Sequence, residues 1–129
     1  MRGPYGRLLW YRTHRPSAAG MCAQHVMLAL DTPRQGLPDA TAVARVVIKA
    51  GHMRQGPAPR GAIVYWTGGA HGHGHVCFAL GDRTELSVDV NGPRTVGVKP
   101  FPWFDEHWGN LRYAGWSWWW GRINTKPAP

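Results

Sequence analysis

Cys22 is the residue of this chain most able to act as a nucleophile, because of where it stands. It follows the small residues 18–20 and opens a stretch in which apolar residues recur at helical spacing, with Ser17 as a suitable N-cap. The unpaired N–H groups and the positive dipole end of a helix start favour a thiolate over a thiol. We therefore interpret Cys22 as a nucleophile that is activated by a histidine further along the chain.

Three histidines, His71, His73 and His75, occupy alternate positions and are the candidates for the activating base. His75 is the best placed, since it opens an apolar strand, and a strand fixes an imidazole better than the glycine-rich loop that carries the other two. Cys77 shares its face of that strand and reads as inert core. Alternate histidines can also ligate Zn²⁺ or Ni²⁺, but no carboxylate or thiolate partner accompanies them. We expect no metal and no cofactor.

A third polar group has to orient the base, and the strand expected over residues 84–90 offers three. Ser87, Asp89 and Asn91 alternate, so we expect them on one face, beside the strand of His75. Asp89 is the first choice because a carboxylate fixes the tautomer and stabilises the imidazolium. Asn91 and then Ser87 are the alternates. In a competing interpretation, Asp89 only begins the Asn-Gly turn that follows.

The hydrophobic periodicity changes along the chain from helical to strand-like, which predicts an α+β domain. Residues 1–16 read as an arm, residues 17–123 as a single catalytic domain, and residues 124–129 as a frayed tail. We expect two N-terminal helices, the first ending near Leu30 and the second capped by Asp39 or Thr41 and stopped by Gly51. A linker at 56–61 then precedes the remaining predicted elements, which are strands at 62–66, 75–80, 84–90 and 95–98, a helical turn at 102–108, and a last strand at 111–115.

The bulk composition narrows the class of partner. The chain has 129 residues and a formal net charge of +8, and most of the positive excess lies in residues 1–60. The arginines are scattered and show no aromatic-plus-basic RNA-binding signature, so we expect a membrane surface or an acidic cell-wall polymer rather than nucleic acid. No apolar run is long enough to span a membrane, and residues 1–10 lack the apolar region of a secretory signal. We therefore expect a cytoplasmic protein that reaches the cell wall after lysis or on a virion.

Several short motifs, taken in order, resemble the papain-fold peptidoglycan hydrolases of the CHAP and NlpC-like cysteine peptidase families, particularly small phage and actinobacterial endolysin-like members. The matching motifs span residues 17–116: Gly20-Met21-Cys22, the Pro-rich approach from Pro57 to Trp66, Gly68-Gly69 with Gly72 to Val76, Ser87-x-Asp89, and Trp108-Gly109 with Tyr113 to Trp116.

This resemblance implies hydrolysis of an amide bond in peptidoglycan, by an N-acetylmuramoyl-L-alanine amidase or a peptide endopeptidase. It implies a papain-like domain in which N-terminal helices pack on an antiparallel sheet of about five strands. Cys22 corresponds to the nucleophile and His75 to the base, while Asp89 with Asn91 is similar to the third-residue arrangement of some CHAP members. We expect substrate contacts from Trp66, His73 and Trp116.

Other classes of function stay open on the same scaffold. One is a non-catalytic wall-binding or virion structural domain, and another is a cysteine transferase or deamidase toxin. The sequence holds no separate wall-binding domain, so we expect targeting by the basic surface, with the protein acting as a monomer or within a larger phage assembly.

Overall fold

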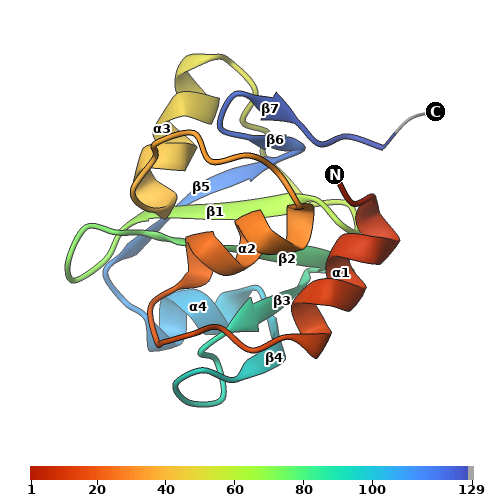
Figure 1. Ribbon diagram of the computed structural model, residues 1–129. Coiled ribbons are helices and arrows are strands. Elements are labelled where there is room, and N and C mark those ends of the chain that lie inside the picture. Colours follow the sequence, from red (N-terminus) through yellow and green to blue (C-terminus); the bar gives the residue numbers. More distant parts are fainter. Residues whose placement is uncertain (128–129) are drawn as a thin grey trace.

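The computed structural model describes residues 1–127 and has an α+β architecture, as predicted (Figure 1). In this part of the chain a five-stranded antiparallel sheet has the order β4-β3-β2-β1-β5. Its strands are β1 (Ile63–Gly68), β2 (His75–Gly81), β3 (Thr84–Val88), β4 (Val96–Pro100) and β5 (Leu111–Ser117). The helices are α1 (Pro4–Thr13), α2 (Cys22–Leu30), α3 (Ala40–Lys49) and α4 (Pro102–His107), and β6 (Trp119–Trp120) pairs with β7 (Ile123–Asn124) in a short hairpin.

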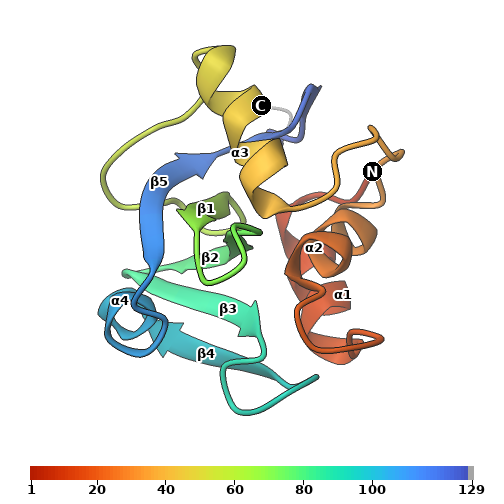
Figure 2. The ribbon, with the colours of Figure 1, turned by 90° about the vertical axis from the view of Figure 1, so that its left-hand side faces the viewer.

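The two faces of the sheet carry separate hydrophobic cores. We call the face covered by α1, α2 and α3 the helical face, and the opposite one, which packs against α4, the α4 face (Figure 2). Along β2 the side chains alternate between them: Val76 and Phe78 belong to the helical-face core, whereas Cys77 and Ala79 belong to the α4-face core. A residue on β2 is therefore committed to one core or the other.

The two predicted N-terminal helices are confirmed, with one change at the first cap. Helix α2 begins at Cys22, but its N-cap is Met21, which makes no side-chain capping bond, and not Ser17. Helix α3 is capped by Asp39, whose carboxylate accepts a hydrogen bond from the backbone N–H of Ala42 at 2.8 Å. Within the described residues, no helix combines the length and apolar character that a membrane crossing requires.

The predicted arm at residues 1–16 is instead a helix that belongs to the core. Glycines at positions 3 and 6 lower the helix propensity of this segment, but Pro4 is tolerated in the first turn of α1. Its residues Leu8 and Tyr11 are buried against α2 and the sheet. The predicted frayed tail also differs, because Thr125 is buried, and residues 128 and 129 lie outside the described part of the chain.

Arg7 joins the two ends of the chain from a buried position on α1. Its guanidinium donates hydrogen bonds to the carbonyls of Arg2, Gly61 and Thr125 and to the Thr125 hydroxyl, at 2.7–3.2 Å. Burial lowers the pKa of Arg7 to about 10, so the group is still charged at neutral pH. One cation thus satisfies carbonyls from three separate segments.

We predict that Arg7→Met lowers the free energy of unfolding by about 3 kcal/mol, because those buried carbonyls lose their donors. Urea denaturation measures the change. Arg12→Met, on the exposed side of the same helix, is the matched control and should stay within about 0.5 kcal/mol of the parent. Equal effects of the two substitutions would contradict the structural role of Arg7.

Candidate active site

The Cys22 side chain is buried at the first residue of α2. It is 8% exposed and belongs to the helical-face core together with Val76. Burial raises the pKa of the Cys22 thiol to about 11, although the backbone N–H groups of Val76 and Ala23 act in the opposite direction. The helix start therefore offers the N–H groups that the sequence predicts, but loss of hydration outweighs them.

The strands β2 and β3 separate beside this cysteine. Their backbone pairing runs from Gly81 opposite Thr84 to Phe78 opposite Leu86 and ends there. Beyond that point the backbone N–H of Val88 donates to the hydroxyl of Tyr11 at 2.8 Å instead of to β2. Backbone donors of both strands are thus turned toward side chains from the N-terminal helices.

His75 opens β2, as predicted, and its ring lies in the α4-face core. The ring is 5% exposed and packs against Trp66, Phe104 and Trp108, with centroid distances of 4.8–5.7 Å. Burial lowers the pKa of His75 to about 3, so the imidazole is neutral at physiological pH.

Ser87 fixes the tautomer of this imidazole. The Ser87 hydroxyl lies 2.8 Å from His75 Nε2 and donates its own proton to the carbonyl of Val88 at 3.0 Å. With the hydroxyl proton directed to the Val88 carbonyl, Nε2–H is the donor in the contact with His75. The other ring nitrogen, Nδ1, then carries the lone pair and is the atom that can accept a proton. Ser87, the last of the predicted alternates, is therefore the one that contacts the His75 ring.

The predicted pair of Cys22 and His75 is not joined in this conformation. Cys22 contacts β2 from the helical face, where its sulfur lies near the N–H of Val76, and His75 is the residue just before Val76. Because strand neighbours point to opposite faces, the imidazole lies across the sheet. Among the described residues, no hydrogen bond joins the thiol to a histidine ring.

Asp89 does not orient His75, in contrast to the prediction. Strand β3 ends at Val88, and Asp89 adopts a left-handed conformation with φ 65°, which breaks the expected alternation. Its carboxylate accepts hydrogen bonds from the backbone N–H groups of Gly20 at 2.9 Å and Arg94 at 2.8 Å. Asp89 thus begins a turn, as in the competing interpretation, and also holds the loop that leads into Cys22.

Asn91, the other predicted alternate, is also directed elsewhere. It is exposed in the same turn, and its backbone N–H donates to the hydroxyl of Thr95 at 3.2 Å. Of the three polar residues predicted to alternate beside the base, only Ser87 remains within the strand and contacts the ring.

A pocket of about 320 Å³ opens beside His75 between two loops. The β1–β2 loop contributes His71 and His73, and the segment that follows α4 contributes Trp108 and Asn110. Trp108 is the functional candidate that residue-by-residue reasoning missed. The sequence signal for it is the Trp108-Gly109 pair before the last strand, one of the motifs of the resemblance.

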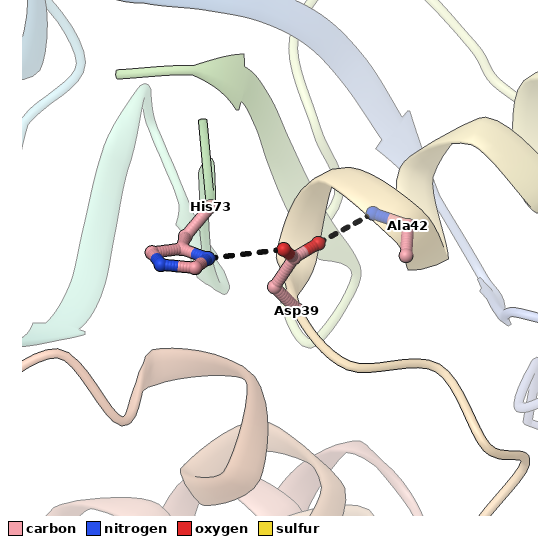
Figure 3. Close-up of polar contacts among 3 residues, drawn as sticks. All are labelled: Asp39, Ala42 and His73. Atoms are coloured by element: carbon pink, nitrogen blue, oxygen red, sulfur yellow. Dashed lines mark hydrogen bonds and ion pairs between the residues drawn. The ribbon is translucent and has the colours of Figure 1, made fainter. Parts of the chain in front are cut away.

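The β1–β2 loop is docked on the start of α3. The carboxylate of Asp39 contacts His73 Nδ1 at 3.1 Å with one oxygen while its other oxygen caps the helix through Ala42 (Figure 3). Gly74 permits this approach, since its φ is +70° and a Cβ there would lie 2.5 Å from the Trp66 carbonyl and 2.6 Å from the Thr41 hydroxyl oxygen. His73 therefore lies at the pocket, and its role as a substrate contact stays a prediction.

The other two predicted substrate contacts lie elsewhere. Trp66 is fully buried in the α4-face core, so it supports the ring of His75 instead of facing a ligand. Trp116 is on the edge strand β5, where its indole N–H donates to the carbonyl of Gln55 at 3.2 Å, and it does not line this pocket. Bulky aromatic residues on inner strands are more often core than binding surface, and Trp66 follows that rule.

The alternating histidines His71, His73 and His75 do not converge on one point. In residues 1–127, no group of three or more His, Cys, Asp or Glu side chains is close enough to hold a metal ion. The rings of His71 and His73 are 6.4 Å apart, and His75 is turned into the core. For chemistry, this end of the molecule offers a pocket with one oriented imidazole and, on the other face of the sheet, a buried thiol.

Comparison with known proteins gives no further assignment. No protein-family model, no curated protein and no solved structure matches this chain.

Proposed function

We propose that this protein is a cysteine hydrolase that cleaves an amide bond in peptidoglycan, as an amidase or an endopeptidase. The observation that carries the proposal is that a thiol and an oriented imidazole approach the same end of strand β2, from opposite faces of the sheet. The sulfur of Cys22 lies near the N–H of Val76, and His75, held by Ser87, precedes it. The motif order of the papain-fold families adds the substrate class.

The chemistry would be acyl transfer. His75 Nδ1 takes the proton of the Cys22 thiol while the sulfur attacks the amide carbonyl carbon. The N–H of Cys22, which has no helical acceptor at the first position of α2, would stabilise the oxyanion. The imidazolium then returns the proton to the leaving amine as the C–N bond breaks. Water hydrolyses the thioester and regenerates the thiol.

The conformation described here is a resting state in this proposal. A pKa of about 11 for the thiol and about 3 for the imidazole both oppose formation of a thiolate–imidazolium pair. Both shifts come from burial, so hydration or substrate binding at this strand end would reduce them together. Productive chemistry requires the His75 ring and the sulfur to meet at the open end of β2.

The pocket beside His75 suits part of a glycan–peptide substrate. Trp108 offers an aromatic surface for a sugar ring, and the polar side chains of His73 and Asn110 lie on the same rim. A second hollow of about 290 Å³, near the N-terminal helices, is lined by His14, Arg15 and Arg94. Its basic side chains support the proposed attraction to anionic wall polymers, which salt would weaken.

A second candidate is a wall-binding domain without catalytic activity. It is favoured by the same burial, because a neutral thiol that is separated from the base by the sheet is typical of a structural cysteine. The two candidates share the pocket and differ in the need for Cys22. The following experiments separate them.

Cys22→Ser should reduce the release of soluble fragments from purified sacculi by a factor of about 10³ or more. The reason is that a serine hydroxyl is a much weaker nucleophile than the cysteine thiol that it replaces. Cys77→Ala, in the other core, is the control and should retain most of the activity of the parent. Binding to sacculi should survive in both variants. Equal lysis by Cys22→Ser and the parent would rule out the nucleophile, and binding without lysis by the parent would favour the second candidate.

Among the polar residues near the pocket, we predict a graded loss of sacculus hydrolysis. His75→Gln should abolish hydrolysis, because the proton acceptor is lost. Ser87→Ala should reduce it by about 10²-fold through the wrong tautomer, and Asp89→Asn should have a smaller effect on kcat. His73→Ala should leave much of the activity. If Asp89→Asn were as harmful as His75→Gln while Ser87→Ala was silent, the assignment of Ser87 would be wrong.

Alkylation of Cys22 by iodoacetamide should be slow near pH 7 and should rise with pH toward a midpoint of about 11, since the thiolate is the reacting form. Because its pKa is raised, the Cys22 thiol stays protonated at neutral pH. Below the midpoint, the thiolate fraction and therefore the alkylation rate grow about tenfold per pH unit. Peptide mapping by mass spectrometry distinguishes Cys22 from Cys77. Rapid alkylation of Cys22 at pH 7 would show that the resting state described here does not dominate in solution.

A further inference from the structure

Glu85 is a buried carboxyl group without a hydrogen-bond partner, and it has no part in the chemistry proposed for Cys22. It lies on β3, is 3% exposed, and its Oε2 atom makes no hydrogen bond. Leaving a buried polar group unpaired costs free energy, and a carboxylate costs more than a neutral group. Such an orphaned group inside a native core requires an explanation.

The cations nearest to Glu85 along the chain and across the sheet do not neutralise it. Lys99 stands directly opposite on β4, but its Nζ lies over the ring of Trp103, 5.3 Å from the centroid. Arg83 is exposed in the turn before β3 and makes no ion pair with Glu85 within 4 Å. Burial accordingly raises the pKa of Glu85 to about 7.

Glu85 lines a pocket that is separate from the one beside His75. This pocket has a volume of about 150 Å³, and none of its lining residues is shared with the site at the start of β2. Phe101 and Tyr113 form an aromatic corner with ring centroids 4.8 Å apart, and Arg83 stands at the same pocket. The pocket therefore combines a carboxyl group, a guanidinium and an apolar wall.

We propose that this pocket binds a small zwitterion of the size of a free α-amino acid, with its ammonium group at Glu85 and its carboxylate at Arg83. An ammonium ion would supply the hydrogen-bond donors that Glu85 lacks. A guanidinium pairs with a carboxylate through two parallel hydrogen bonds, and Arg83 is free to do so. The volume of about 150 Å³ is below the roughly 300 Å³ of pockets for drug-sized ligands, which fits a ligand of about one amino acid. This inference does not rest on the proposed hydrolase.

Two charged groups in the pocket select against simpler ligands. An alkylamine would satisfy Glu85 but leave Arg83 without a partner, and a simple carboxylate would do the reverse and face the Glu85 charge. The other titratable groups that interact with Glu85 are Tyr113 and Cys77, and burial raises the pKa of both, so they remain neutral near pH 7. Charge selection therefore falls to Glu85 and Arg83.

Titration with L-alanine, followed by NMR of the Phe101 and Tyr113 rings and of the Glu85 carboxyl carbon, tests the proposal on the intact chain. L-Alanine should bind in the millimolar range or tighter, and propylamine and propionate should each bind about tenfold more weakly. Saturation with L-alanine should lower the pKa of Glu85, because the ammonium group favours the carboxylate. Glu85→Gln and Arg83→Gln should each weaken L-alanine binding about tenfold or more. Lys99→Gln and the exposed Glu106→Gln are matched controls and should not weaken it.

Several results would overturn the proposal. Absence of any shift with L-alanine at about 10 mM would exclude a site of useful affinity. Propylamine binding as tightly as L-alanine would remove the role of Arg83, and an unchanged Glu85 pKa at saturation would place the ligand elsewhere. The titration of the parent protein decides this last point even if Glu85→Gln does not fold. If Cys22→Ser loses hydrolysis but still binds L-alanine, the amino-acid site does not depend on the proposed hydrolase activity.

Discussion

The early end of the β2–β3 pairing is the constraint on which the candidate site depends. Past Phe78 and Leu86 the backbones of β2 and β3 no longer pair, so their N–H and C=O groups need other partners. The hydroxyl of Tyr11 accepts from the N–H of Val88, and the N–H of Val76 lies near the sulfur of Cys22 and favours its thiolate. Helices α1 and α2 thus insert side chains where a continuous ladder would have excluded them. The nucleophile candidate is at the sheet because the sheet opens there.

The same burial that fixes these groups keeps them unreactive. At the start of α2 the helix dipole and the nearby N–H groups favour a thiolate, yet desolvation is the larger effect and raises the pKa of Cys22. On the other face, the aromatic shell around His75 removes water and lowers the pKa of the imidazole. Ser87 orients the ring without adding charge, whereas a carboxylate would have raised that pKa. The pair is therefore ordered but uncharged.

Local patterns in the sequence predicted the elements well and their side-chain partners less well. The start of α2 at Cys22 and the position of His75 at the opening of β2 follow from periodicity, and the Asp39 cap follows from capping chemistry. The alternation along β2 is also correct, and it is what places His75 across the sheet from Val76 and Cys22. Pairing Cys22 with His75 required the relation between helix and sheet face, which periodicity does not contain.

Two other differences arise from the backbone and from distant contacts. Asp89 leaves the strand because it adopts a positive φ, an option open to Asp that alternation cannot anticipate. Helix α1 forms although its helix propensity is poor, because the burial of Tyr11 and the hydrogen bonds of Arg7 stabilise it. Arg7 and Thr125 are 118 positions apart in the chain, so no local window of the sequence predicts their contact.

In the proposed hydrolase, the reactivity of Cys22 would depend on the loop that precedes it. Asp89 accepts from the N–H of Gly20, and Arg94 donates from Nε to the carbonyl of Pro16, so the β3–β4 turn is fastened to the segment that leads into α2. The Asp89 charge also contributes to the raised pKa of the thiol, after burial. Separation of the two loops would hydrate the sulfur and move it away from this carboxylate. Both changes lower the pKa of Cys22, so a ligand that parts these loops would activate the thiol without any new catalytic group.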